Sequence, residues 1–285
     1  MTQESLRLGF FLAGLLGFAV CELVARHHDP VVPRGRRFAI NLGLGAINGV
    51  ITTAVCAFCY LLAESEAAPW RYGPLQWLAL PVFVRLPVEV LILDLLVYFL
   101  HRAFHAQPAL WRLHRVHHSD RDLDVSSASR FHIGEVMVSA VSKFSAVQLL
   151  GISPAGLVSF EVVMLLASQF EHSNVRLPAA LERALWRILV PPAMHRIHHH
   201  PLRAATDSNF GTLVSVWDRA FATLRTSSPS DREFGVPDLP DAQSLGLVAL
   251  LLLPIRSPRS SAIRPSARDG ERPVGPDHQE GERAR

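Results

Sequence analysis

Apolar residues along this chain gather into long runs that short charged loops separate. Leu8 to Ala25 is almost wholly apolar, and Phe38 to Ala63 forms a second run of the same character. Each run is long enough to cross a bilayer, because a helix rises about 1.5 Å per residue. The first run lacks a strongly basic leader and a small-residue cleavage site. We therefore interpret it as a membrane span and not as a cleaved signal peptide.

Three further runs follow. Leu75 to Leu100 is interrupted by Arg85-Leu86-Pro87, which predicts two shorter helices there. Ile133 to Phe170 is apolar on both sides of Gly151-Ile152-Ser153-Pro154, which predicts a hairpin of two helices. Leu245 to Ile255 is too short to span a bilayer, so we expect it to lie against the protein or the membrane interface.

The loops between the runs predict an orientation. The segment 26–37 carries four arginines, which is typical of a cytoplasmic loop. Counting the spans from there places every histidine cluster on the cytoplasmic side. The sequence thus predicts an all-α fold: a polytopic membrane helical bundle with a cytoplasmic, histidine-rich helical cap that holds a di-metal site.

We divide the chain into four parts. Residues 1–75 are expected to hold N-terminal transmembrane helices and loops, and residues 76–226 the catalytic domain. Residues 227–256 form a C-terminal peripheral segment. Residues 257–285 are rich in Arg, Pro, Ser, Gly and Glu and are expected to be a disordered tail.

Composition narrows the classes of protein. With 49% apolar and 19% charged residues, the chain is neither disordered nor a disulfide-stapled miniprotein. Its net charge of +3 comes from arginines beside apolar runs and not from one basic stripe, so we expect no nucleic acid as a partner. Lys143 is the only lysine among many arginines. This bias is typical of a GC-rich, bacterial genome and hence of an inner-membrane protein.

Histidine carries the candidate chemistry. Most of the 14 histidines lie between residues 101 and 200, and eight form three clusters: His101-x3-His105, His114-x2-His117-His118 and His195-x2-His198-His199. Positions i, i+3 and i+4 share one helix face, so each cluster can aim two or three imidazoles at one point. Eight imidazoles exceed the four ligands of one tetrahedral zinc ion. They would suit two metal ions of octahedral type.

Other polar residues extend this pattern. Asp94 and Tyr98 share one helical stripe with His101 and His105, at i, i+4, i+7 and i+11. Asp94 could accept an N–H from a ligand imidazole, or it could cap or pack within a helix bundle. His132 and His172 stand alone at helix ends, as further ligands or as structural residues. We expect His27, His28 and His278 to be solvated.

These motifs resemble the fatty acid hydroxylase superfamily, also called the sterol desaturase family. The resemblance covers residues 94–223. Its motifs are D-x3-Y-x2-H-R-x2-H at 94–105, H-R-x-H-H at 114–118 and 195–199, R-x-H-x-x-E at 130–135, H-S-N at 172–174, and D-S-N-F-G with W-D-R-A-F at 207–221. Ile133 stands where the family often has proline, and Ala222 where it often has glycine.

The resemblance implies an integral-membrane, non-haem di-iron enzyme that uses O2 and external electrons. It implies nine iron ligands: His101, His105, His114, His117, His118, His172, His195, His198 and His199. Eight of these nine, all except His172, are the cluster histidines, and these eight are expected to carry catalysis. Seven further motif positions have an orienting or open role: Asp94, Tyr98, His132, Glu135, Asn174, Asp207 and Asn209.

Function follows as an expectation. The chain is expected to bind two iron ions and hydroxylate a membrane lipid (fatty acyl, sterol or related) with O2 as co-substrate. An external electron-transfer protein of ferredoxin or cytochrome type would supply electrons, because no haem-binding segment is evident. Desaturation on the same site is the alternative within the enzyme class. A non-catalytic membrane metal-binding protein is the alternative outside it. The lipid and the oligomeric state stay open.

Overall fold

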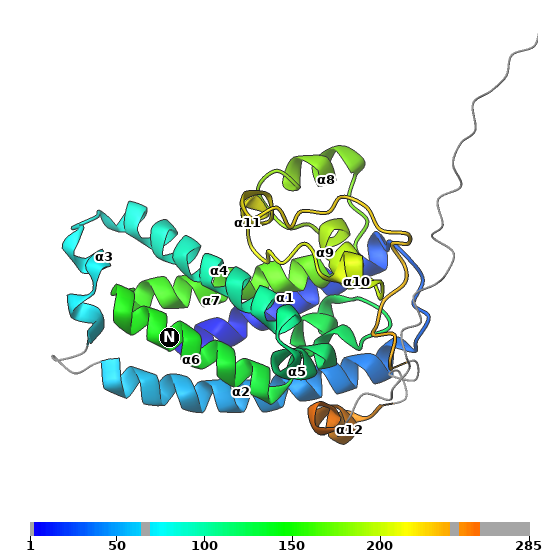
Figure 1. Cartoon of the computed structure of the whole chain (residues 1–285), viewed down its shortest axis with the longest axis horizontal. Coiled ribbons are helices and arrows are strands. Elements are labelled where there is room, and N and C mark those ends of the chain that lie inside the picture. Colours follow the sequence, from blue (N-terminus) through cyan, green and yellow to red (C-terminus); the bar gives the residue numbers. More distant parts are fainter. Residues whose placement is uncertain (1–2, 64–68, 240–244, 257–285) are drawn as a thin grey trace, which may run out of the picture.

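The computed structural model describes residues 3–63, 69–239 and 245–256. Helices joined by loops make up these residues, and two isolated bridges, Arg26 with Val175 and Leu189 with Val214, are the only strand-type pairings among them. Figure 1 shows the arrangement. The helices are α1 Gln3–Val24, α2 Arg34–Ala63, η1 Pro69–Tyr72, α3 Pro74–Trp77, α4 Val82–Ala106, α5 Pro108–His118, η2 Val125–Ser129, α6 Ile133–Leu150, α7 Pro154–His172, α8 Ala179–Leu185, α9 Pro192–His198, α10 Arg203–Thr206, α11 Val216–Ala220, α12 Leu247–Leu251 and η4 Leu253–Ile255. The predicted tail at 257–285 lies outside the described residues.

The long helices form a bundle with an apolar outer surface. Among the described helices, three are long and apolar enough to cross a membrane: α1, α2 over Arg34–Val55, and α6. α7 packs against both α1 and α4, while α2 packs against α6. Large apolar side chains such as Leu16, Val50 and Leu149 are exposed on the three candidate spans. This confirms the predicted all-α membrane bundle, because such side chains favour lipid over water.

One helix boundary was predicted wrongly. α4 runs without interruption through Pro87, whereas the break in the third apolar run lies earlier, at residues 78–81. Pro87 lies near the start of the 25-residue helix, so its missing N–H removes a hydrogen bond only from the first turns. The side chain of Arg85 donates to Glu89 one turn later and holds this end of the helix. Ala79, in the actual break, has a left-handed φ of 46°.

The predicted hairpin at 133–170 is present as α6 and α7. Gly151 ends α6 with a left-handed φ of 78°, and Ser153 caps α7 by accepting from the N–H of Gly156. His132 is the N-cap of α6, and Ile133 is therefore the first residue of the helix. Proline is favoured at that position, which explains why relatives can carry it in place of Ile133.

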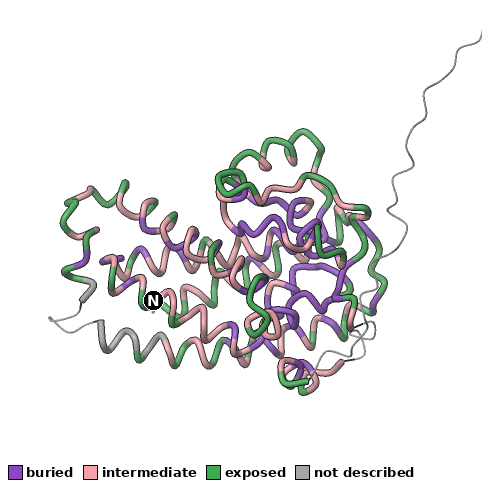
Figure 2. The backbone as a smooth tube through the Cα atoms, viewed as in Figure 1, coloured by how far each residue is buried: buried purple, intermediate pink, exposed green. Residues whose placement is uncertain are grey.

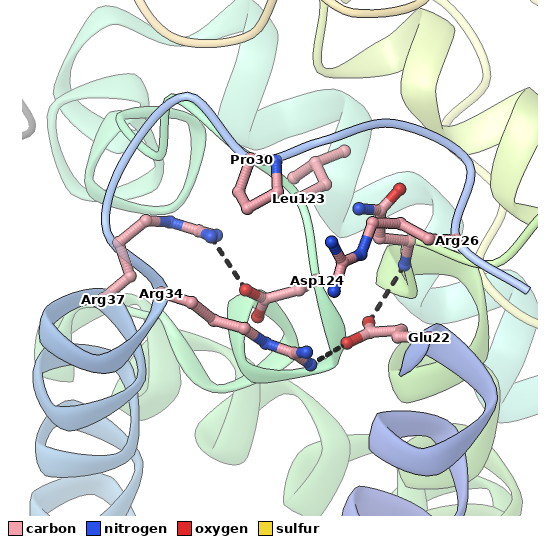
Figure 3. A pocket seen from close by; sticks show the side chains of 8 residues that line it. Glu22, Arg26, Pro30, Arg34, Arg37, Leu123 and Asp124 are labelled. Atoms are coloured by element: carbon pink, nitrogen blue, oxygen red, sulfur yellow. Dashed lines mark hydrogen bonds and ion pairs between the residues drawn. The ribbon is translucent and has the colours of Figure 1, made fainter. Parts of the chain in front are cut away.

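A polar clasp joins the ends of α1 and α2 to the loop around η2. Figure 3 shows its small polar pocket, where Glu22 pairs with Arg34 and accepts from the backbone N–H of Asn174. Arg37 donates to Asp124 at 2.7 Å and to Asp120 at 2.8 Å, and all three side chains are buried. The clasp therefore ties the first two helices to the segments that carry the histidines.

The C-terminal segment lies against the protein, which is one of the two expected positions. Leu250 and Leu253 pack with Leu44 of α2 and Val116 of α5 in one apolar cluster. The buried guanidinium of Arg115 donates to the carbonyl oxygens of Leu253 and Arg256. Figure 2 shows that buried residues concentrate at the end of the bundle that holds α5 and α9. The candidate site lies in this compact end.

Candidate metal centre

Four helices bring nine histidines together at the compact end of the bundle. α4 contributes two of them near its C-terminus, and α5 contributes three. α7 ends on one, and α9 with its C-cap contributes three. The nine are His101, His105, His114, His117, His118, His172, His195, His198 and His199, and every one of them is buried.

The nine imidazoles form two groups, each with its ligand nitrogens within 4.8 Å of one another. The five-histidine group consists of His101, His105, His114, His118 and His198. The four-histidine group consists of His117, His172, His195 and His199. Neighbours in sequence belong to different groups, as with His117 and His118. The groups therefore adjoin, and the rings of His118 and His199 stack with centroids 4.4 Å apart.

Backbone and carboxylate oxygens fix the tautomers in the five-histidine group. His101 Nδ1 lies 2.9 Å from the carbonyl oxygen of Phe210, and His114 Nδ1 lies 2.6 Å from a carboxylate oxygen of Glu135. A carbonyl or carboxylate oxygen only accepts, so both Nδ1 atoms carry the proton. Their Nε2 atoms then carry a lone pair and no proton, yet the two Nε2 atoms lie only 3.1 Å apart. Two lone pairs at this distance repel unless a cation lies between them.

The four-histidine group repeats this arrangement at His172. His172 Nδ1 donates to the carbonyl oxygen of Ser168 at 2.7 Å, which leaves its Nε2 as a lone pair. That Nε2 atom lies 3.0 Å from His195 Nε2 and 3.1 Å from His117 Nε2. His195 Nδ1 in turn faces the carboxylate of Glu171 at 3.6 Å. The Nε2 atoms thus point at one centre from three directions.

Burial keeps several of these imidazoles neutral. It lowers the pKa of His117, His118, His195 and His199 well below the ordinary value, and that of His198 to about 3. The cationic form is disfavoured because water is excluded. Neutral imidazole is the form that binds a metal.

The donor set fits transition-metal ions. His105 and His198 each leave a buried Nε2 atom without a hydrogen-bond partner, while their Nδ1 atoms are held by Asp207 and by the carbonyl oxygen of Ser208. Imidazole suits iron, zinc, copper and nickel. Five converging nitrogens exceed a tetrahedral zinc site and suit an ion of higher coordination number.

The expected orienting residues divide into two kinds. Glu135 and Asp207 contact imidazoles of the five-histidine group directly, at 2.6 Å from His114 and 3.3 Å from His105. Asp94 does not act on an imidazole. It accepts from the indole of Trp217 at 2.8 Å and faces the backbone N–H groups of residues 213 and 214. Asp94 therefore holds the loop that carries Phe210, whose carbonyl oxygen accepts from His101.

Four other motif residues support the surrounding loops. Tyr98 bonds through its hydroxyl to Thr223. The amide of Asn209, which has a left-handed φ of 54°, donates to the carbonyl oxygens of residues 194 and 225. Asn174 bonds through its side chain to the backbone of His28. His132 accepts from the N–H of Gly134 and faces the carbonyl oxygen of Leu251. It lies outside both histidine groups.

Sequence reasoning missed two residues. Glu171 is buried beside His172 and His195, and the only signal was an acid immediately before a candidate ligand at the end of an apolar run. His28 was expected to be solvated, which is wrong. It is 7% exposed, since Asn174 and Asp122 enclose it. A loop position gave no signal of that burial.

Comparison with known proteins finds a family that resembles part of this chain. A sequence model described as fatty acid hydroxylase matches residues 86–223, which contain all nine histidines. Over these residues the chain is similar to fatty acid hydroxylases. This confirms the resemblance that the motifs carry. No solved structure matches the chain.

Proteins similar to this chain include several enzymes named for lipids. An ornithine lipid hydroxylase of Rhizobium tropici is 26% identical over 73% of this chain and 59% of its own length. Alkylglycerol monooxygenase of Homo sapiens is 28% identical over 46% of this chain and 28% of its own length. Cholesterol 25-hydroxylase of Homo sapiens is 28% identical over 49% of this chain and 50% of its own length. The chain thus spans less than two thirds of each of these relatives.

Proposed function

We propose that this protein is a membrane-bound oxidoreductase that holds two iron ions and uses O2 to hydroxylate a lipid. The observation that carries the proposal is the convergence of buried imidazole nitrogens in two adjoining groups. The names of the relatives support the reaction type, since each is a hydroxylase or monooxygenase named for a lipid. The substrate is a fatty acyl, sterol or related lipid.

The ligand assignment follows the two groups. The five-histidine group would hold one iron ion and the four-histidine group the other. When bound, the iron ions supply the O2 activation needed to break an unactivated C–H bond, which side chains alone cannot do. The four-histidine group offers fewer nitrogens and so leaves more room for oxygen ligands.

The chain itself orients the imidazoles and excludes water. Glu135, Asp207 and backbone carbonyls hold the Nδ1 protons, so the Nε2 atoms stay aimed inward. Aromatic rings enclose the groups: Phe131 stacks on His117 at 4.3 Å, and Phe210 contacts His105 at 5.2 Å. An apolar shell of this kind limits the access of solvent to the centre.

The reaction requires electrons from outside the chain. Hydroxylation converts R–H, O2, two electrons and two protons into R–OH and water. Desaturation consumes the same reagents and yields a C=C bond and two waters. We propose a ferredoxin- or cytochrome-type protein as the donor and a bilayer lipid as the substrate. We further propose that the chain lies in a bacterial inner membrane with the arginine-rich loop 26–37 on the cytoplasmic side. The histidine groups then lie at the cytoplasmic face of that membrane.

Lipid mass spectrometry on cells tests the proposal. Cells carrying the wild-type chain are compared with cells carrying His117→Ala/His118→Ala at matched expression. A lipid that gains one oxygen only with the wild-type chain supports hydroxylation, whereas a lipid that loses two hydrogens indicates desaturation. The iron and zinc content of the purified protein tests the non-catalytic alternative. If the protein purified from an iron-replete host contains zinc alone and no lipid changes in the cells, the proposed enzymatic function is contradicted.

A further inference from the structure

The two histidine groups differ in how close they come to solvent. The oxygen partners behind His114 and His172 are Glu135 and Ser168, and Glu171 faces His195 at 3.6 Å; both carboxylates are buried. The partner behind His105 is different. Asp207 is 34% exposed at its side chain and still lies 3.3 Å from His105 Nδ1. Among the described residues, this carboxylate connects the five-histidine group to the surface.

An indole ring lies beside the same surface point. Trp111 of α5 is half-buried, and its ring lies 5.0 Å from that of His105 and 5.4 Å from that of His118. Thr206, also half-buried, places its hydroxyl 3.5 Å from His118 Nδ1. Two imidazoles of one group are thus separated from solvent by single side chains.

Cationic side chains border this point. Arg203 is 71% exposed and donates to Asp207 at 2.8 Å. Arg225 reaches the carbonyl oxygen of Ala204 in α10 and forms no ion pair with a carboxylate in the described part of the chain. We name Trp111, Thr206, Asp207, Arg203 and Arg225 the entry patch. The entry patch carries two guanidinium groups and one carboxylate, so it attracts an acidic surface.

We infer that the entry patch is where an acidic one-electron donor protein docks and passes electrons to the five-histidine group. This inference rests on the proposed function, which requires two electrons per turnover. Each encounter oxidises one reduced donor and reduces one ferric ion to the ferrous form, so two encounters serve one O2. Arg203 and Arg225 attract the donor by their charge. Trp111 lies between the docked donor on one side and the imidazoles of His105 and His118 on the other.

Stopped-flow reduction of the iron-loaded protein tests the docking site. A reduced plant-type ferredoxin, which is acidic, is mixed anaerobically with the full chain in lipid nanodiscs, and ferredoxin oxidation is followed by absorbance. We expect Arg203→Gln/Arg225→Gln to lower the second-order rate constant about tenfold at 10 mM salt, with the difference vanishing near 1 M salt. Arg183→Gln/Arg187→Gln is the control. It removes two exposed charges in and next to α8, which lies apart from α10 (Figure 1), and should change the rate little.

The indole is tested separately. Trp111→Leu should lower the limiting rate at saturating ferredoxin, while Trp111→Phe restores most of it because a ring again lies between the donor and the imidazoles. Reduction by dithionite, a small reductant that needs no docking, should be alike in all arginine variants. Iron content is measured for every variant, so that loss of iron is not mistaken for slow electron transfer.

The outcomes separate the two proposals. An unchanged rate in Arg203→Gln/Arg225→Gln, or an equal fall in the control pair, would overturn the entry patch while leaving the lipid reaction intact. An iron-loaded protein that makes product with membrane extracts but accepts no electron from ferredoxin or from a soluble, acidic cytochrome b5 overturns the acidic donor. A chain that binds no iron and makes no product with any donor refutes the proposed function itself.

Discussion

Removing the carboxylate behind His114 should weaken one metal position and spare the other. Glu135 reaches from the first turn of α6 to His114 Nδ1 at 2.6 Å, and both side chains are buried. In Glu135→Leu this bond is lost, and the ring of His114 can turn its Nε2 atom away from the five-histidine group. Among the described residues, no hydrogen bond or ion pair joins Glu135 to the four-histidine group.

The size of the effect follows from the bond. A hydrogen bond to a charged group contributes about 1.5–3 kcal/mol, which corresponds to roughly 10–100-fold in a binding constant. Loss of a carboxylate behind a metal-bound imidazole costs about 10–100-fold in metal affinity in other proteins. We therefore expect the affinity of one ion to fall by about this factor. Glu135→Gln keeps an acceptor oxygen in place and should lose less.

The assay is equilibrium competition with a chelator, read as iron bound per chain. The wild-type chain should hold two ions over a wide range of chelator concentration, while Glu135→Leu should pass through a plateau near one. Glu161→Gln is the control, because Glu161 is a carboxylate of the same bundle that pairs with Arg7 and lies behind no imidazole. Two ions held as tightly in Glu135→Leu as in the wild type would refute the assignment of Glu135.

Three further predictions concern stability. Ala222 has a left-handed φ of 56°, so Ala222→Gly should raise the free energy of unfolding by about 1 kcal/mol, measured by denaturation in detergent. A lower value would contradict strain at this turn. His132→Ala should lower stability by about 1 kcal/mol through loss of the α6 cap but keep two bound ions; loss of an ion would make His132 a ligand. The metal-free chain should lose stability as the pH falls from 6.5 toward 3, because unfolded histidines bind protons in this range while buried ones such as His198 do not. A flat pH profile by calorimetry would contradict this burial.

The sequence predicted the helices and the histidine clusters because each follows from a local rule. Runs of apolar residues mark α1, α2 and the α6–α7 hairpin, and helical periodicity places His114, His117 and His118 near one another. The family resemblance favoured a ligand role for His172, whose lone position at a helix end left the ligand and structural roles both open. The break predicted at Pro87 is wrong, because α4 continues through this proline, whose missing N–H costs one hydrogen bond in the second turn of the helix.

The division of the histidines into two groups could not be predicted from spacing. His117 and His118 are consecutive, yet they serve different groups, because a step of one residue turns a side chain by about 100° around a helix. The hydrogen-bond partner of Asp94 could not be predicted either, because Trp217 lies 123 residues further along the chain. Only the packing of α4 against later segments decides such contacts.

The facing lone pairs also affect the stability of the metal-free chain and hence the abundance of the protein in a cell. Without a cation, His101 and His114 hold bare nitrogens 3.1 Å apart inside a dry core. A bound ion removes that repulsion, and at a thousandfold excess over its dissociation constant it adds about 4 kcal/mol to stability. That is a large share of the 5–15 kcal/mol that typically holds a domain together. Iron supply would then set the protein's lifetime as well as its turnover, with starved cells clearing the empty chain by proteolysis.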